Sequence, residues 1–163
     1  MTIEELSQND LLEAAHIYFT TVNMQNPPGN ISADEAVQQL LLNFAFKKYK
    51  VLVSKSYNKI DGISIFQQSR DKLDLFFIGA YPMSAGRGTL LLNELKSYAI
   101  KQNVKSINTV VSSIDKKAVN FYSSFGFKKI GQMGKQEMSN LPQIKMILNF
   151  NLTNAQIPFK QQD

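Results

Sequence analysis

Two glycines stand one residue apart, directly before a leucine-rich stretch, in the segment GAYPMSAGRGTLLL at 79–92. Because Gly86 and Gly88 have no Cβ, an anion can approach the backbone N–H groups closely here. The start of a helix would add unpaired N–H groups and the positive end of the helix dipole. Arg87 adds a charged donor and Thr89 a hydroxyl. The segment therefore predicts phosphate binding, and a ligand-free turn from a strand into a helix explains the glycines equally well.

The spacing of this segment excludes two common phosphate-binding motifs. A P-loop would continue with Gly-Lys-Ser or Gly-Lys-Thr, whereas leucines follow here. A dinucleotide-binding fingerprint would need a third glycine and an acidic residue about 20 positions further on. The segment is therefore neither the phosphate loop of a P-loop protein nor the pyrophosphate loop of a dinucleotide-binding domain.

Tyr122 is the second candidate for chemistry, in the segment DKKAVNFYSSFGFKKIG at 115–131. A phenol can donate its proton to a leaving group. The alternative is a core aromatic residue, because Phe121 and Phe125 lie beside it on the same predicted apolar face.

Together, the two segments resemble the signatures of the GCN5-related N-acetyltransferases (GNAT). The second segment matches the pattern A-x-x-x-Y-x-x-x-G-F, and M-S-A-G-R-G at 83–88 resembles the pyrophosphate loop Q/R-x-x-G-x-G/A. The matching residues of the second segment are Ala118, Tyr122, Gly126 and Phe127. The two motifs occur in the family's order, separated by one helix and one strand. The resemblance covers nearly the whole chain and is most specific over 73–131.

The resemblance implies transfer of an acetyl group from acetyl-CoA to an amine, by direct attack in a ternary complex. Two central parallel strands, 73–80 and 105–112, would splay apart and admit the pantetheine arm. Tyr122 would be the general acid for the departing thiolate. The cofactor-binding residues that it implies are Phe77, Ile78, Ala80, Met83, Ser84, Ala85, Gly86, Arg87, Gly88, Thr89 and Asn120.

The chain departs from the family pattern at several positions. Met83 stands where Gln or Arg is usual, so a side-chain donor is lost. Asp115 stands where Asn is frequent, and we expect it to cap the following helix. The general base is not identified: Asp74, Glu35, Tyr81 or a water relay are the candidates. Met83 and the unidentified base support an alternative function, a non-catalytic acyl-CoA-binding or sensing domain on the same fold.

The acceptor would be the amine of a small molecule or peptide. Its pocket is expected between the first two helices, the loop at 23–30 and the last hairpin. The residues expected to line it are Tyr18, Phe19, Asn23, Met24 and Gln25. They are uncharged, and no acidic cluster marks a site for a polycationic amine.

The hydrophobic pattern predicts the elements that position these residues. Apolar spacing indicates helices from Asn9 or Asp10 to about Val22, and from a Ser32–Glu35 capping box to about Phe46. The pattern also predicts a short strand near Ile3, and strands at 49–56, 63–69 and 73–80 with a turn at 57–62. The order is completed by a helix at 90–102, a strand at 104–113, a helix at 116–126 and strands at 127–132 and 144–151. This order predicts an α/β fold with a mixed, mostly antiparallel sheet, a central splayed parallel strand pair and helices on both faces. The domain would span 1–152, followed by a polar tail at 153–163.

Composition limits the remaining function classes. The chain has 163 residues, no cysteine and one histidine, His16, so we expect no disulfide and no metal site. The net charge of +5 is not concentrated, and a nucleic-acid partner is not expected. The N-terminus lacks the pattern of a signal peptide, and no apolar run reaches the ~20 residues of a membrane span. We therefore expect a cytoplasmic protein, without a membrane partner, that is a monomer or homodimer.

Overall fold

The computed structural model describes residues 1–25, 28–82, 86–133 and 142–150. The elements, in chain order, are β1 (Thr2–Glu5), the 3-10 helix η1 (Gln8–Asp10), α1 (Leu11–Asn23), α2 (Ala33–Phe46), β2 (Lys50–Ser56), β3 (Lys59–Ser69), β4 (Lys72–Ala80), α3 (Arg87–Lys101), β5 (Ser106–Ser112), α4 (Lys116–Ser124), β6 (Lys128–Met133) and β7 (Gln143–Asn149). The predicted order of elements is confirmed. The proposed domain boundary after residue 152 lies outside the described residues.

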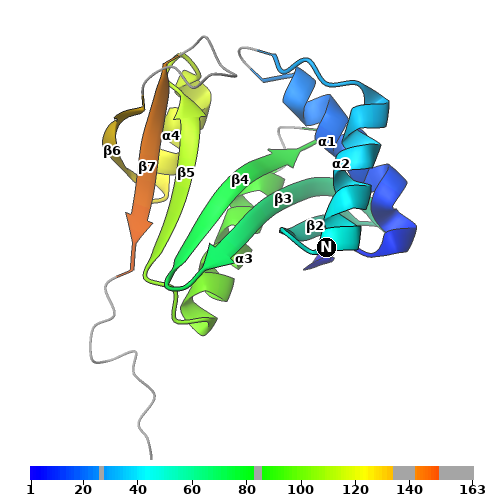
Figure 1. Cartoon of the computed structure of the whole chain (residues 1–163), viewed down its shortest axis with the longest axis horizontal. Helices are drawn as coiled ribbons and strands as arrows, with labels where there is room; N and C mark the ends of the chain where they lie inside the picture. Colours follow the sequence, from blue (N-terminus) through cyan, green and yellow to red (C-terminus); the bar gives the residue numbers. More distant parts are fainter. Residues whose placement is uncertain (26–27, 83–85, 134–141, 151–163) are drawn as a thin grey trace, which may run out of the picture.

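One mixed sheet forms the centre of the fold, with the strand order β1-β2-β3-β4-β5-β7-β6. Neighbouring strands are antiparallel except for β4 and β5, which are parallel. Helices α1 and α2 cover one face, and α3 and α4 cover the other (Figure 1). The predicted α/β class, with a central parallel pair and helices on both faces, is confirmed.

Two hydrophobic cores hold the helices against the sheet. One core joins α3 and α4 to β4, β5 and β7, and it includes Leu92, Leu95 and Met146, which are fully buried. The other joins α1 and α2 to β2 and β3, around Val53 and Ile63. Because burial of apolar area is the main stabilising term, each helix pair is anchored separately and β4 lies between the two cores.

Local signals account for the element ends. Ser32 and Glu35 form the predicted capping box at the start of α2. The hairpin between β2 and β3 turns at only two residues, Tyr57 and Asn58, both with positive φ, as a type I′ turn requires. The expected turn at 57–62 is therefore too long, and this places Asp61 within β3. Helix α3 begins at Arg87, three residues earlier than predicted, and β5 is shorter at both ends.

No helix in the described part of the chain is both long enough and apolar enough to cross a membrane.

Candidate functional site

Strands β4 and β5 are paired over only half of β4. Their register runs from Lys72 opposite Ser106 to Leu75 opposite Thr109. We call this last pair the fork, because β4 continues to Ala80 and β5 to Ser112 without further mutual pairing, and the two strands diverge (Figure 1). Backbone groups on the facing edges beyond the fork can therefore bond to a ligand inserted between the strands. The stretch of β4 beyond the fork, 76–80, includes three predicted cofactor-binding residues, Phe77, Ile78 and Ala80.

A β-bulge follows the fork directly. Leu75 is opposite Phe66 and Phe77 is opposite Ile65, so Phe76 is an extra residue in β4. A bulge bends its strand and re-aims the side chains next to it. In a regular strand Phe76 and Phe77 would point to opposite faces, whereas here both line one cavity.

Tyr122 is fixed by the end of α4. Gly126 has a φ of +92°, and its N–H donates to the Ser123 carbonyl while the Phe127 N–H donates to the Tyr122 carbonyl. This pair of bonds is a Schellman motif, which explains why Gly126 ends the helix as predicted. Asp115 caps the other end, as expected, by accepting a hydrogen bond from the Ala118 N–H (3.0 Å). Both ends of the short helix that carries Tyr122 are thus bonded.

The Tyr122 phenol lies near the fork, in the core beneath the sheet. Its ring packs against Phe121 and Phe127 in edge-on contacts. Thr109, which lies next to the phenol, donates a hydrogen bond to the Leu75 carbonyl (3.1 Å), joining the two strands where they part. Burial raises the pKa of the Tyr122 phenol to about 12, and the Thr109 hydroxyl partly offsets this rise. The phenol therefore keeps its proton at neutral pH.

The predicted anion site falls at the start of α3 and stays a prediction. Gly86 immediately precedes the helix with a φ of +70°, a conformation that favours glycine. A Cβ placed at Gly86 would meet no other atom of the described residues within 4 Å. At Gly88 a Cβ would meet the Phe121 ring at 3.6 Å, an ordinary contact. Met83, Ser84 and Ala85 lie outside the described residues.

The Arg87 side chain is bound to a carboxylate that the sequence reasoning missed. Arg87 Nε lies 2.8 Å from Asp61 Oδ2, and Asp61 Oδ1 accepts a hydrogen bond from Ser54 Oγ (2.6 Å). Burial alone would raise the pKa of the Asp61 carboxyl, but hydrogen bonds from Ser54, Ser56 and Arg87 outweigh it and hold the pKa below its ordinary value. This contact ties the start of α3 to β3. The missed signal is the two-residue turn at Tyr57 and Asn58, which moves Asp61 from loop to strand.

Replacing Asp61 by asparagine tests this tether. The variant should lower the free energy of unfolding by about 2 kcal/mol, because the Arg87 charge loses its nearly buried partner. Under the cofactor role that the resemblance implies, affinity for CoA should also fall several-fold, because Asp61 would no longer hold Arg87 at the start of α3. Urea unfolding and a CoA titration measure the two effects. Asp71→Asn is the matched control: its ion pair with Lys105 is largely exposed, and neither measurement should change appreciably. Equal behaviour of the two variants would contradict the tether.

The three residues considered as general base have other partners or positions. Asp74 lies before the fork and pairs with Lys72 (3.7 Å). Glu35 is engaged in the capping box of α2. Tyr81 follows the end of β4, and its side chain is exposed. Asn120, which was expected to contact the cofactor rather than to act as a base, is exposed on α4. The structure therefore places neither carboxylate beside Tyr122.

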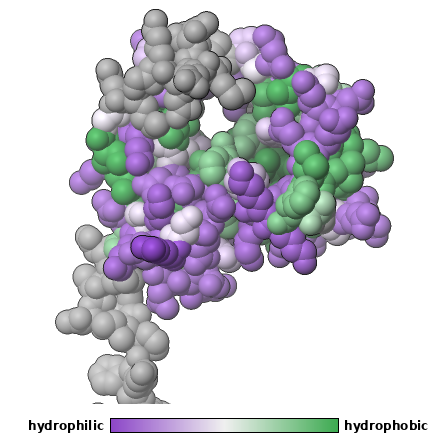
Figure 2. Space-filling view, viewed as in Figure 1, coloured by the Kyte–Doolittle hydropathy of each residue, from purple (hydrophilic) through white to green (hydrophobic). Residues whose placement is uncertain are grey.

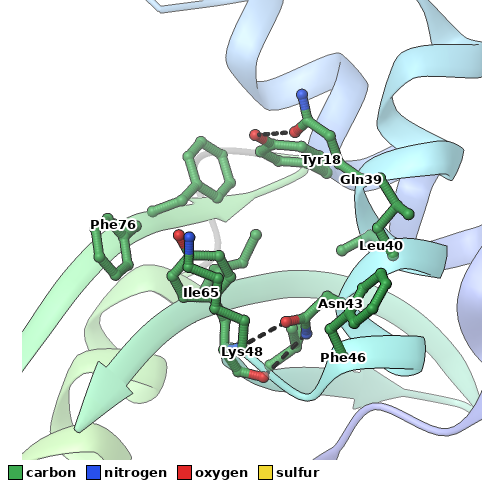
Figure 3. Close-up of a pocket in the computed structure, with 12 residues that line it drawn as sticks. Tyr18, Gln39, Leu40, Asn43, Phe46, Lys48, Ile65 and Phe76 are labelled. Atoms are coloured by element: carbon green, nitrogen blue, oxygen red, sulfur yellow. Dashed lines mark hydrogen bonds between the residues drawn. The ribbon is translucent and has the colours of Figure 1, made fainter. Parts of the chain in front are cut away.

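A cavity of about 470 Å³ lies between α2 and strands β2, β3 and β4, on the face covered by α1 and α2 (Figure 3). We call it the aromatic cavity; its lining residues are Tyr18, Gln39, Leu40, Leu42, Asn43, Phe46, Lys48, Tyr49, Val51, Ile65, Phe76 and Phe77. This side of the molecule is hollowed, and hydrophobic residues gather over β4 and α2 (Figure 2). Of the residues expected in the acceptor pocket, only Tyr18 lines this cavity. The Asn23 amide is bound to the Ile31 backbone instead.

Two buried oxygens near the open end of β5 have no hydrogen-bond partner among the described residues. They are Ser112 Oγ and Gln143 Oε1, on residues that face each other in the β5–β7 register. Buried polar atoms without partners are rare. The unpaired strand edges beyond the fork and the glycine at the start of α3 fit a long ligand that carries amides and phosphates, as the pantetheine arm and pyrophosphate of CoA do.

Comparisons with known proteins agree with this geometry. A family model described as an acetyltransferase (GNAT) domain matches residues 13–150. The structure is similar to the ribosomal-protein-S18-alanine N-acetyltransferase from Escherichia coli (TM-score 0.73, 22% identity, covering 97% of this chain and 99% of that chain). It is also similar to yncA from Salmonella typhimurium with its cofactor acetyl-CoA (TM-score 0.71, 20%, 96% and 98%). A third similar structure is the PaiA N-acetyltransferase from Thermoplasma acidophilum in complex with coenzyme A (TM-score 0.71, 16%, 92% and 100%). No curated protein sequence matches the chain.

Proposed function

Because this chain belongs to the GNAT acetyltransferase family, we propose that it is an N-acetyltransferase that moves an acetyl group from acetyl-CoA to an amine. The observation that carries the proposal is the fork: a protonated phenol lies beside the point where two parallel strands part. A phenol at this point could donate its proton to the inner end of a ligand that is inserted between the strands.

Three sets of groups would hold acetyl-CoA. The backbone of Phe77, Ile78 and Ala80, beyond the fork, would pair with the amides of the pantetheine arm. The amides of the glycine segment, from Met83 to Thr89, would bind the pyrophosphate with help from the dipole of α3. Asn120, on the exposed side of α4, is a further candidate contact. The solved neighbours that carry acetyl-CoA or coenzyme A support this assignment by their similarity of fold.

Tyr122 would serve as the general acid. When bound, acetyl-CoA supplies an acetyl thioester, and a C–N bond to the amine forms as the C–S bond breaks. The Tyr122 hydroxyl would give its proton to the departing sulfur, which otherwise leaves as a thiolate. The nitrogen carries an extra proton once the C–N bond forms and would lose it to water, and the Tyr122 phenolate would take a proton back from water. The raised pKa keeps the phenol protonated wherever the acceptor amine is able to react. Direct attack by the amine needs no covalent acyl-enzyme, which fits a chain without cysteine.

An assay of thiol release from acetyl-CoA, over a panel of amines, tests the function. At least one amine should be turned over, with formation of an N-acetyl product that mass spectrometry detects. Affinity for CoA, measured separately by calorimetry, shows whether the cofactor site is intact. Tight CoA binding without turnover of any amine would overturn the proposal and favour the non-catalytic acyl-CoA-binding domain.

A further inference from the structure

The aromatic cavity keeps large apolar side chains in contact with water. Phe46 is 76% exposed, Leu42 57% and Phe76 55%, and all three line the same hollow. Tyr18 and Phe77 form an edge-on aromatic pair within it (ring centroids 4.9 Å apart). Apolar residues gathered at one concave place usually mark a binding site, and the cavity volume lies in the range of small-molecule pockets.

The charge at the lining of the cavity is positive. Among the described residues that line it, Lys48 is the only charged one, and none of them is a carboxylate. The Lys48 ammonium lies 5.2 Å from the centre of the Tyr49 ring, so the positive charge is held at the wall. A ligand with several positive charges would meet repulsion and find no partner among these residues.

The polar groups of the cavity are few and partly engaged. The Asn43 side chain donates to the Tyr49 carbonyl (2.9 Å) and accepts from the Tyr49 N–H (2.7 Å), so its amide is already used (Figure 3). Tyr18 Oη donates to Gln39 Oε1 (3.0 Å), which leaves the Gln39 NH₂ as a donor. An extended peptide needs partners for each buried backbone group, and this lining supplies few of them. A compact apolar ligand is favoured over a peptide.

The bulge connects the cavity with the fork. Phe76 and Phe77 line the cavity and follow Leu75 directly, and the Leu75 carbonyl is bonded to Thr109, next to the Tyr122 phenol. A ligand that packs against Phe76 and Phe77 therefore lies one or two residues along β4 from the fork. The fork is the place where the acetyl group of the bound cofactor is proposed to lie.

We propose that the aromatic cavity binds the acceptor, and that the acceptor is a monoamine on a compact aromatic or aliphatic body. This inference rests on the proposed function. Transfer of an amine from water to apolar walls near Lys48 disfavours its charged form. The bound amine would thus be held in the neutral form that attacks a thioester, so neither Asp74 nor Glu35 would be needed to remove a proton from it.

Leu42→Arg tests the cavity, with Leu41→Arg as the matched control. The two leucines are neighbours on α2 and both are substantially exposed, but only Leu42 lines the cavity. Arginine is a good helix former, so both variants should fold, which circular dichroism checks. The probes are phenethylamine and hexylamine, titrated into the CoA-bound protein by calorimetry and used as substrates. Leu42→Arg should raise Kd and KM for both probes by at least about 10-fold, because a hydrated guanidinium replaces an apolar wall against which the neutral amine and its apolar body would pack. Leu41→Arg should change them less than about twofold. CoA affinity should not change in either variant.

Spermidine and a short peptide with a free N-terminal amine complete the panel. The kcat/KM of phenethylamine and hexylamine should be at least about 10-fold higher than that of spermidine and of the peptide. Loss of one favourable contact is enough to produce a difference of this size. If the probes bind and Leu42→Arg weakens them but no amine is acetylated, the cavity inference stands and the proposed function fails. If spermidine or the peptide is acetylated with the same KM by Leu42→Arg and the unaltered protein, the function stands and the cavity inference is overturned. Absence of binding by both probes also overturns it.

Discussion

Gly86→Asp should abolish CoA binding, with a loss of affinity of at least about 100-fold, the effect of placing a carboxylate against phosphates. The backbone at Gly86 has a φ of +70°, which aspartate and asparagine tolerate better than most residues. A Cβ there meets no other described atom within 4 Å, so the substitution adds a charge without forcing a side chain into the core. Calorimetric titration with CoA measures the affinity.

Gly86→Asn is the matched control for this prediction. It has nearly the same size and the same backbone cost as the aspartate variant but no charge. Both variants should lose some affinity, because each adds a side chain where phosphates approach the backbone. The difference between them isolates the electrostatic part and should increase at low ionic strength. Equal CoA affinity in the two variants would show that the phosphates lie elsewhere.

Tyr122→Phe should lower kcat by about 100-fold, the lower end of what a general acid contributes. The Kd for CoA should stay within about twofold, because only the hydroxyl is removed. The phenylalanine ring can keep the packing against Phe121 and Phe127, so the fold should be retained. Steady-state kinetics with the best amine of the panel, together with a CoA titration, separate the two effects.

Tyr98→Phe controls for the loss of a tyrosine hydroxyl. Tyr98 is half-buried on α3, and its hydroxyl donates to Gln68 (3.0 Å) in an exposed hydrogen bond, so removal of the hydroxyl should leave kcat unchanged. An unchanged kcat in Tyr122→Phe would remove the acid role and leave Tyr122 as a core residue. A fall in both kcat and CoA affinity would indicate damage to the fork rather than loss of a proton donor.

The Tyr122 phenol also has consequences at high pH. Its pKa is about 12 in the folded protein and 10 when unperturbed, so the unfolded chain releases this proton first as the pH rises. The contribution of Tyr122 to stability is complete below pH ~10 and is lost as the pH approaches ~12. Tyr122→Phe should therefore lose less stability than the unaltered protein over this range, in urea unfolding curves.

The local sequence determined the parts of the fold that depend on neighbouring residues. The capping box of Ser32 and Glu35, the cap by Asp115 and the helix end at Gly126 each involve residues a few positions apart, and all three are found in the structure. The family membership was also predictable, because the glycine segment and the Tyr122 segment are short and well defined. The roles proposed for the residues in these segments remain predictions.

Tertiary structure alone decided the contacts that depend on strand register. The Asp61–Arg87 pair requires a two-residue turn at Tyr57 and Asn58, since a longer turn would take Asp61 out of β3. The aromatic cavity requires the bulge at Phe76, which turns two successive side chains to one face. Side chains in a strand alternate between faces, so a shift of one residue reverses every assignment, and sequence periodicity does not locate a bulge. The glycines and the tyrosine could thus be identified from the chain by itself, whereas the aromatic cavity appears only when the register of β3 and β4 is known.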